Sequence, residues 1–113
     1  ELVERGYDAV RIDAYPHLVA ADADREWNLL PPWSVQDWGS PEPTTVRVWP
    51  ALPEFMRKCA ERGLRVALSS WFQNDGTERR LAIPGPAALA AVWGATLARL
   101  ENEGLLGHVL YVD

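Results

Sequence analysis

Glu61-Arg62-Gly63-Leu64-Arg65-Val66-Ala67-Leu68-Ser69 decides the fold, because a helix end, a glycine and a short apolar run follow one another there. The same order occurs at residues 4–13 (ERGYDAVRID) and at residues 103–113 (EGLLGHVLYVD). A glycine just past a helix, followed by a run rich in Val, Ile and Leu, is typical of a helix that leads into a buried parallel strand. The repetition predicts an α/β protein with three parallel strands and crossover helices.

The side chains of the three strands alternate in a way that favours a barrel. Arg11 and Asp13 lie on one side of the first strand, and its apolar residues lie on the other. In a barrel the apolar side meets the surrounding helices and the polar side faces the interior. The predicted interior rows are Arg11, Ala67 and Tyr111, then Asp13, Ser69 and Asp113; the predicted helix side holds Val10, Ile12, Ala14, Val66, Leu68, Leu110 and Val112.

A polar row near the carboxyl ends of the strands is costly to bury unless its members pair or meet a ligand. A doubly wound sheet is more often apolar on both faces. The sequence therefore predicts a segment of a (β/α)8 TIM barrel, as one partial unit over residues 1–113. The chain opens without Met in what reads as a helix and stops on a strand, so we expect two open strand edges and further parts of the same barrel as its partner.

The connection at about residues 15–52 is the least usual stretch, since two to six residues are typical between a strand and its helix. It holds six prolines and four of the six tryptophans, Trp27, Trp33, Trp38 and Trp49. Disordered segments are poor in aromatic residues, so this long loop is expected to be functional. A short helix around residues 20–30 is expected within it. Pro53 and Pro86 are expected as the first residues of the two crossover helices, with Phe55, Met56 and Cys59 on an apolar stripe of the first.

Composition excludes several classes of function. The net charge of −5 argues against a nucleic-acid surface, which is normally basic. No apolar run approaches the roughly 20 residues of a membrane span. A single cysteine, Cys59, excludes an internal disulfide and a zinc cluster of cysteines. Glycine-rich phosphate loops, His-x-His metal pairs and the serine-hydrolase elbow are absent from the sequence, so neither a cofactor nor a metal is expected.

The aromatic residues of the strand-end loops favour a carbohydrate ligand, because a flat indole packs on the C–H faces of a pyranose and offers a polar N–H. Trp33, Trp38 and Trp71 are the candidates, and Trp71 is the best because it continues an interior-facing strand. The alternative is that the loop tryptophans pack the long loop onto the barrel as a second core.

The polar candidates for binding substrate lie on the same strand ends. Arg11 and Asp13 lie two residues apart on one strand, so both side chains enter the same side, either as a structural ion pair or as ligand-binding groups. The remaining candidates follow the strands directly: Tyr15, His17, Gln73, Asn74 and Asp113.

The three strand motifs, Val10-Arg11-Ile12, Val66-Ala67-Leu68-Ser69-Ser70-Trp71 and Val109-Leu110-Tyr111-Val112-Asp113, resemble strands two, three and four of cellulase-like glycoside hydrolases. These enzymes belong to the retaining (β/α)8 clan. The resemblance implies that Arg11 is the interior arginine at the end of strand two. Many members carry a histidine at the position of Trp71, which is a departure here. The family's acid/base glutamate, in an Asn-Glu pair, would follow directly after Asp113.

The resemblance thus implies part of a glycosidase of carbohydrate metabolism that acts on a poly- or oligosaccharide by a retaining two-carboxylate mechanism. This segment would supply residues of the substrate cleft and no assigned catalytic residue. Two alternatives stay open: a barrel that binds glycans without hydrolysing them, and a TIM-barrel enzyme that is not a glycosidase.

Overall fold

The computed structural model describes residues 2–29, 44–70, 77 and 79–113. Three parallel strands, β1 (Ala9–Asp13), β4 (Arg65–Ser69) and β5 (Val109–Val112), form one sheet in the order β1-β4-β5. Helix α2 (Val48–Glu61) connects β1 to β4, and α3 (Pro86–Asn102) connects β4 to β5. The prediction of three parallel strands with crossover helices is therefore confirmed.

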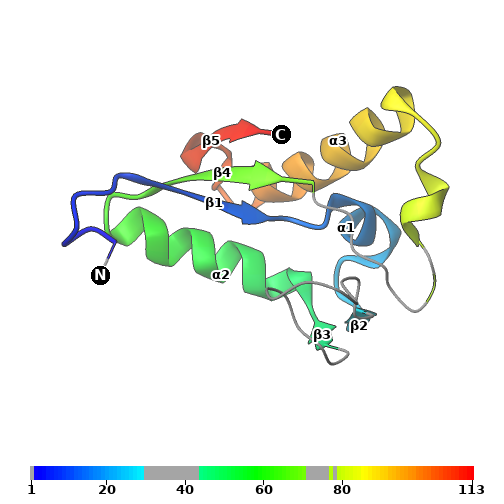
Figure 1. Cartoon of the computed structure of the whole chain (residues 1–113), viewed down its shortest axis with the longest axis horizontal. Coiled ribbons are helices and arrows are strands. Elements are labelled where there is room, and N and C mark those ends of the chain that lie inside the picture. Colours follow the sequence, from blue (N-terminus) through cyan, green and yellow to red (C-terminus); the bar gives the residue numbers. More distant parts are fainter. Residues whose placement is uncertain (1, 30–43, 71–76, 78) are drawn as a thin grey trace, which may run out of the picture.

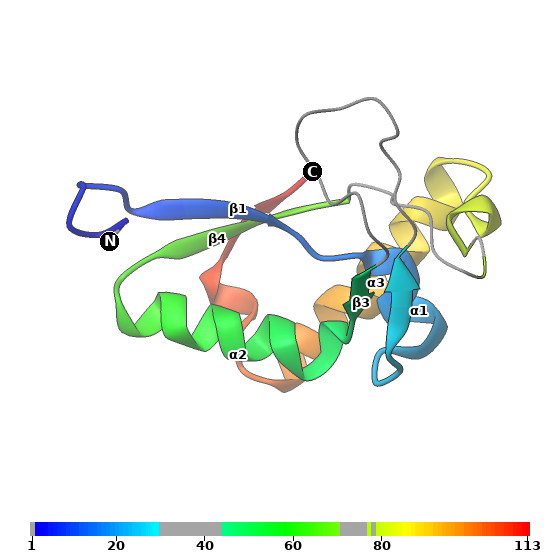
Figure 2. The ribbon, with the colours of Figure 1, turned by 60° about the horizontal axis from the view of Figure 1, so that its bottom comes forward.

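Both crossover helices lie on the same face of the sheet, and among the described residues the other face carries no helix (Figures 1 and 2). In a doubly wound sheet the helices would cover both faces, whereas a barrel places all of them outside. The consecutive strand order and the single helical layer are consistent with a segment of a (β/α)8 barrel. In such a barrel the helix-free face would line the interior.

The main core fills the space between the sheet and the two helices. Val66 and Leu68 of β4 are fully buried there, together with Met56 of α2 and Leu100 of α3. Burying one such side chain contributes roughly 1.5–3 kcal/mol. The register pairs Val10 with Val66 and Ile12 with Leu68, so the predicted helix side of these two strands is confirmed.

The three glycine passages share one backbone geometry. Gly6, Gly63 and Gly104 all have left-handed φ angles, of 86°, 73° and 73°. At each, the glycine N–H bonds the carbonyl three residues back and the next N–H bonds the carbonyl five residues back. This is the Schellman motif that ends helices. Around Gly6 the described residues form a turn with this hydrogen-bond pattern and not the predicted helix.

The stretch between β1 and α2 holds more secondary structure than a plain loop. Helix α1 (Pro16–Asp22) begins immediately after the first strand, earlier than the short helix expected at residues 20–30. Two short strands, β2 (Trp27–Leu29) and β3 (Thr44–Val46), pair antiparallel. In both views these elements lie beyond the carboxyl ends of β1 and β4. Leu18, Trp27 and Leu29 form a second, smaller core in them.

The crossover helices confirm one predicted start and correct the other. Pro86 is the first residue of α3, as expected. Helix α2 begins at Val48, with a non-helical Trp49, so Pro53 lies within the first turn after that kink and not at the helix start. Met56 and Cys59 are buried as predicted, but Phe55 is 38% exposed because the open edge of β1 leaves it uncovered. Two short 3₁₀ helices, η1 (Arg79–Ala82) and η2 (Leu106–His108), complete the described elements.

The last strand departs from simple alternation. Val109 pairs with Val66 and Val112 with Leu68, so three steps along β5 correspond to two along β4. Val109 packs against the main core, whereas Leu110, expected on the helix side, is 38% exposed. An irregularity of this kind disrupts the ladder locally and changes which face a side chain takes. The predicted row of Arg11, Ala67 and Tyr111 is confirmed for Arg11 beside Ala67, whereas Leu110 and Tyr111 together lie opposite Ala67 in the irregular part of β5.

Candidate functional site

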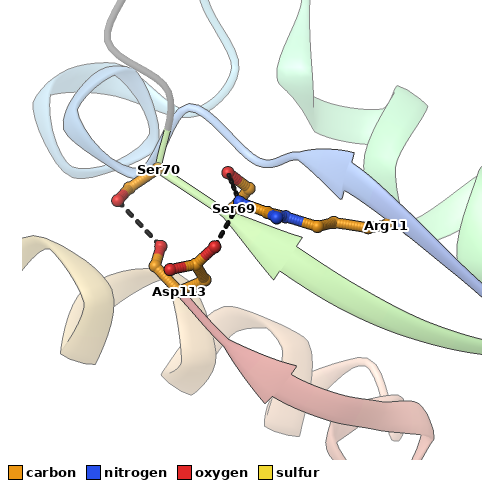
Figure 3. A network of polar contacts seen from close by, with 4 residues as sticks. All are labelled: Arg11, Ser69, Ser70 and Asp113. Carbon is orange, nitrogen blue, oxygen red and sulfur yellow. Dashed lines mark hydrogen bonds and ion pairs between the residues drawn. The ribbon is translucent and has the colours of Figure 1, made fainter.

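Polar side chains from all three parallel strands meet at the carboxyl end of the helix-free face. Arg11 of β1 extends across β4 to form an ion pair with the carboxylate of Asp113, which follows β5 (Figure 3). On the way its Nη2 atom lies 3.4 Å from the hydroxyl oxygen of Ser69. Asp13 stands opposite Ser69 in the register. Four residues predicted to share this end of the sheet are thus brought together by the parallel register.

The Arg11–Asp113 pair is accessible to solvent. The two side chains are 56% and 51% exposed. An exposed pair of this kind contributes about 0–1 kcal/mol to stability, so a ligand can share its donors and acceptors at small cost. The sequence suggested Asp13 as a structural partner of Arg11, but the ion pair described at Arg11 is with Asp113.

A hollow of about 350 Å³ opens beside this pair, lined by Arg11, Ile12, Asp13 and Ser69. Its polar groups are a guanidinium that only donates hydrogen bonds, a carboxylate and a hydroxyl. Such a mixture matches a ligand whose hydroxyl groups both donate and accept. The hollow is therefore chemically suited to a polyhydroxylated molecule.

The backbone of Asp113 is held by β4 at both of its polar groups. Its N–H donates to the carbonyl of Leu68 at 2.8 Å. Its carbonyl accepts the N–H of Ser70 at 3.0 Å and the Ser70 hydroxyl at 2.9 Å (Figure 3). The candidate residues from the sequence did not include Ser70. The sequence feature that could have identified Ser70 is the pair of serines, Ser69-Ser70, at the end of an apolar strand.

Tyr15 adopts a left-handed backbone conformation, with φ 47° and ψ 55°, at the point where the chain turns from β1 into α1. This conformation is uncommon for a residue other than glycine, and it is found at sites that the surrounding structure holds in place. The carbonyl of Tyr15 accepts the N–H groups of Leu18 and Val19, at 2.9 and 3.1 Å. Its ring packs against both cores.

The environment of the Tyr15 hydroxyl disfavours its ionisation. Burial raises the pKa of Tyr15, and the negative charge of Asp13 raises it further. The hydroxyl therefore stays protonated and able to donate a hydrogen bond over the whole neutral range. Tyr15 and Asp13 also share a smaller crevice of about 160 Å³ at the edge of β1.

His17 lies in α1 and is only 3% exposed. Its ring is 6.5 Å from the ring of Tyr15, centroid to centroid, and inclined to it by 54°. The sequence led us to expect this histidine at the rim of the cleft. The structure places it in α1, beyond the carboxyl ends of the strands, with its side chain buried.

The tryptophans of the long connection that the structure describes are buried. Trp27 and Trp49 are 2% and 5% exposed, and each carries an arginine over its ring, Arg25 and Arg99 respectively. The packing alternative therefore holds for these two. The predicted sugar contacts Trp33, Trp38, Trp71, Gln73 and Asn74 lie outside the described residues.

No metal site forms among the described residues, where no group of three or more His, Cys, Asp or Glu side chains converges. Across the same part of the chain, every helix is too short or too polar to cross a membrane. Cys59 is buried, and burial raises the pKa of its thiol. This thiol is therefore part of the core.

Comparison with known proteins adds two findings. A family model described as cellulase-like and sugar-binding matches residues 1–113. A crystal structure of a proposed glycoside hydrolase from Parabacteroides distasonis is 48% identical in sequence, with a TM-score of 0.93. The match covers 99% of this chain and 29% of that protein, so the chain spans less than a third of its length. The search of curated proteins gave no match.

Proposed function

Because this chain belongs to the sugar-binding, cellulase-like family, we propose that the carboxyl ends of β1, β4 and β5 form part of a glycan-binding cleft. In this cleft the guanidinium of Arg11 donates hydrogen bonds to sugar hydroxyls, and the carboxylates of Asp13 and Asp113 accept them. Carbohydrate is then the partner of the helix-free face, together with further strands of the same barrel.

The observation that carries this proposal is the convergence of Arg11, Asp13, Ser69 and Asp113 from three neighbouring strands. In barrel enzymes, binding and catalytic groups lie at the carboxyl ends of the strands. The side chains of Arg11 and Asp113 are more than half exposed, so their donors and acceptors are available to a polar ligand. Trp33, Trp38, Trp71, Gln73 and Asn74 are proposed to add aromatic and amide contacts, with Tyr15 and His17 at the margin.

We further propose that the full-length protein hydrolyses its glycan with retention of configuration. Retaining hydrolysis uses two carboxyl groups about 5–5.5 Å apart, one as acid/base and one as nucleophile. Neither Asp13 nor Asp113 is assigned to these roles. The carboxylate of Asp113 forms an ion pair with Arg11. The acid/base glutamate is expected directly after Asp113, where Arg11 and Asp113 stand beside it.

Binding is tested by titration calorimetry with a panel of neutral oligosaccharides on the full-length protein. Arg11→Ala is expected to weaken binding about tenfold, because charge-assisted hydrogen bonds contribute roughly 1.5–3 kcal/mol each. Trp71→Ala is expected to weaken it as well. Arg65→Ala is the matched control, since Arg65 is exposed at the amino end of β4. Equal affinities of Arg11→Ala and Arg65→Ala for every glycan bound would refute the assignment of Arg11.

A second candidate function is glycan binding without hydrolysis, which the sugar-binding description of the family favours. Incubation of the full-length protein with the glycans it binds separates the two. If products form, proton NMR of the first product shows whether the anomeric configuration is retained. Binding without any product would support the non-catalytic alternative, and inverted product would contradict the retaining mechanism.

A further inference from the structure

Ser70 lies directly after β4 and makes two hydrogen bonds to one acceptor. Its backbone N–H and its hydroxyl both donate to the carbonyl oxygen of Asp113, at 3.0 and 2.9 Å. The two bonds attach the end of β5 to the end of β4. We propose that Ser70 is a positioning residue that sets the place of the Arg11 guanidinium through Asp113. This inference rests on the proposed function, in which Arg11 contacts the glycan.

The ladder between β4 and β5 is irregular just before this end of β5, and the bonds at Asp113 join the two strand ends beyond the irregularity. Between Val66 and Leu68 the pairing of β4 with β5 is irregular, so a shift of β5 along β4 is not resisted by an even series of bonds. Asp113 is held through its N–H, its carbonyl and its carboxylate.

The position of the guanidinium follows from that of Asp113. Arg11 starts from β1 and spans β4 to reach the Asp113 carboxylate, with one additional contact to the Ser69 hydroxyl at 3.4 Å. A contact of 3.4 Å is at the long end for a hydrogen bond, so Asp113 is the dominant anchor. If the end of β5 moves, the guanidinium loses that anchor and no longer holds one place in the hollow.

The first readout is an NMR experiment that needs no glycan. In Ser70→Ala the Asp113 amide is expected to exchange with solvent about fivefold faster, the effect of one hydrogen bond. The Nε–H signal of Arg11, identified by its loss in Arg11→Lys, is expected to shift and broaden. Ser70→Thr keeps a hydroxyl and is expected to restore both signals. Thr45→Ala, which removes an exposed hydroxyl on β3, is the matched control and leaves both unchanged.

A double-mutant cycle shows whether Ser70 acts through Asp113. In an Asp113→Asn background, Ser70→Ala is expected to cause no further change in the Arg11 signal, because the ion pair is already lost. A faster-exchanging Asp113 amide with an unchanged Arg11 signal would mean that Ser70 only secures the strand, and the inference would be wrong. Additive changes in the cycle would also overturn it.

Glycan affinity is the second readout and separates this inference from the proposed function. Ser70→Ala is expected to weaken oligosaccharide binding about fivefold, and Ser70→Thr to restore it to within about twofold. If the Arg11 signal responds as expected but no glycan binds any variant, the positioning role stands and the proposed function fails. If glycans bind Ser70→Ala and the parent protein equally while Arg11→Ala is impaired, the proposed function stands and this inference fails.

Discussion

Tyr15 combines a strained backbone with a shielded hydroxyl at the end of β1. Burial is the larger cause of its raised pKa, and Asp13 is the second. In Asp13→Asn the pKa of Tyr15 is therefore expected to fall, yet to stay above the ordinary value of about 10 because the burial remains. Titration of tyrosinate ultraviolet absorbance measures this, with Tyr15→Phe identifying the signal among the three tyrosines.

The same residue gives stability a definite pH dependence. The unfolded chain loses its tyrosine protons near pH 10, before the folded protein loses that of Tyr15. The free energy of unfolding is therefore expected to fall as the pH rises from about 10 through the raised pKa, and the fall should be smaller in Tyr15→Phe. An identical decline in the two proteins, or a pKa of Tyr15 unchanged by Asp13→Asn, would contradict the shielding.

At the scale of the elements, two glycines in different backbone conformations can be compared: Gly63 follows the end of α2, and Gly94 lies within α3. At Gly63 the φ angle is +73°, so a side chain is strained there although no atom lies near its Cβ. Gly94 lies inside α3, also in open space. Gly63→Ala is expected to reduce the free energy of unfolding by about 1–2 kcal/mol. Gly94→Ala is expected to raise it by about 0.5–1 kcal/mol, since glycine costs that much inside a helix.

Urea denaturation of both variants beside the parent chain measures the difference. Because neither new methyl group meets a neighbour, packing does not complicate the comparison. Changes of the same sign at the two positions would show that backbone conformation does not decide the effect.

How far the elements could be predicted depends on whether a residue type marks them. The glycines that precede the strands, and the register that brings Arg11, Ser69 and Asp113 together, could be predicted from the sequence. Both depend on local signals, namely glycine itself and the alternation of side chains along a strand. The irregular pairing of β5 could not be predicted, because nothing in the sequence at Leu110 and Tyr111 indicates an extra residue. The ion pair of Arg11 with Asp113 joins β1 to the end of β5, two crossover helices further along the chain. Pro16 does mark the start of α1, but the many prolines of the long connection hide this signal.

At the scale of the whole molecule, β1 and β5 are the outer strands of the described sheet, and one face of that sheet carries no described helix. A groove of about 500 Å³ lies beside β1, lined by apolar residues that include Leu2, Val3, Val10 and Phe55 and by the charged Glu4, Lys58 and Arg62. Exposed edges and apolar grooves promote association between chains. Over residues 1–113 alone, the free energy of unfolding is expected to lie below the roughly 5 kcal/mol at which ordinary domains begin.

Thermal and urea denaturation, combined with analytical ultracentrifugation, measure this expectation. We expect a broad transition and concentration-dependent association. A sharp, cooperative thermal transition of a monomer would contradict it, because the core between the sheet and its two helices would then suffice without cover for the other face.

The repeated Schellman motif has a consequence for tolerance to substitution. At Gly6, Gly63 and Gly104 the chain turns into each parallel strand through the same backbone hydrogen bonds, which involve no side chain. Substitutions on the exposed faces of the crossover helices are therefore expected to leave the entry of the chain into each strand unchanged.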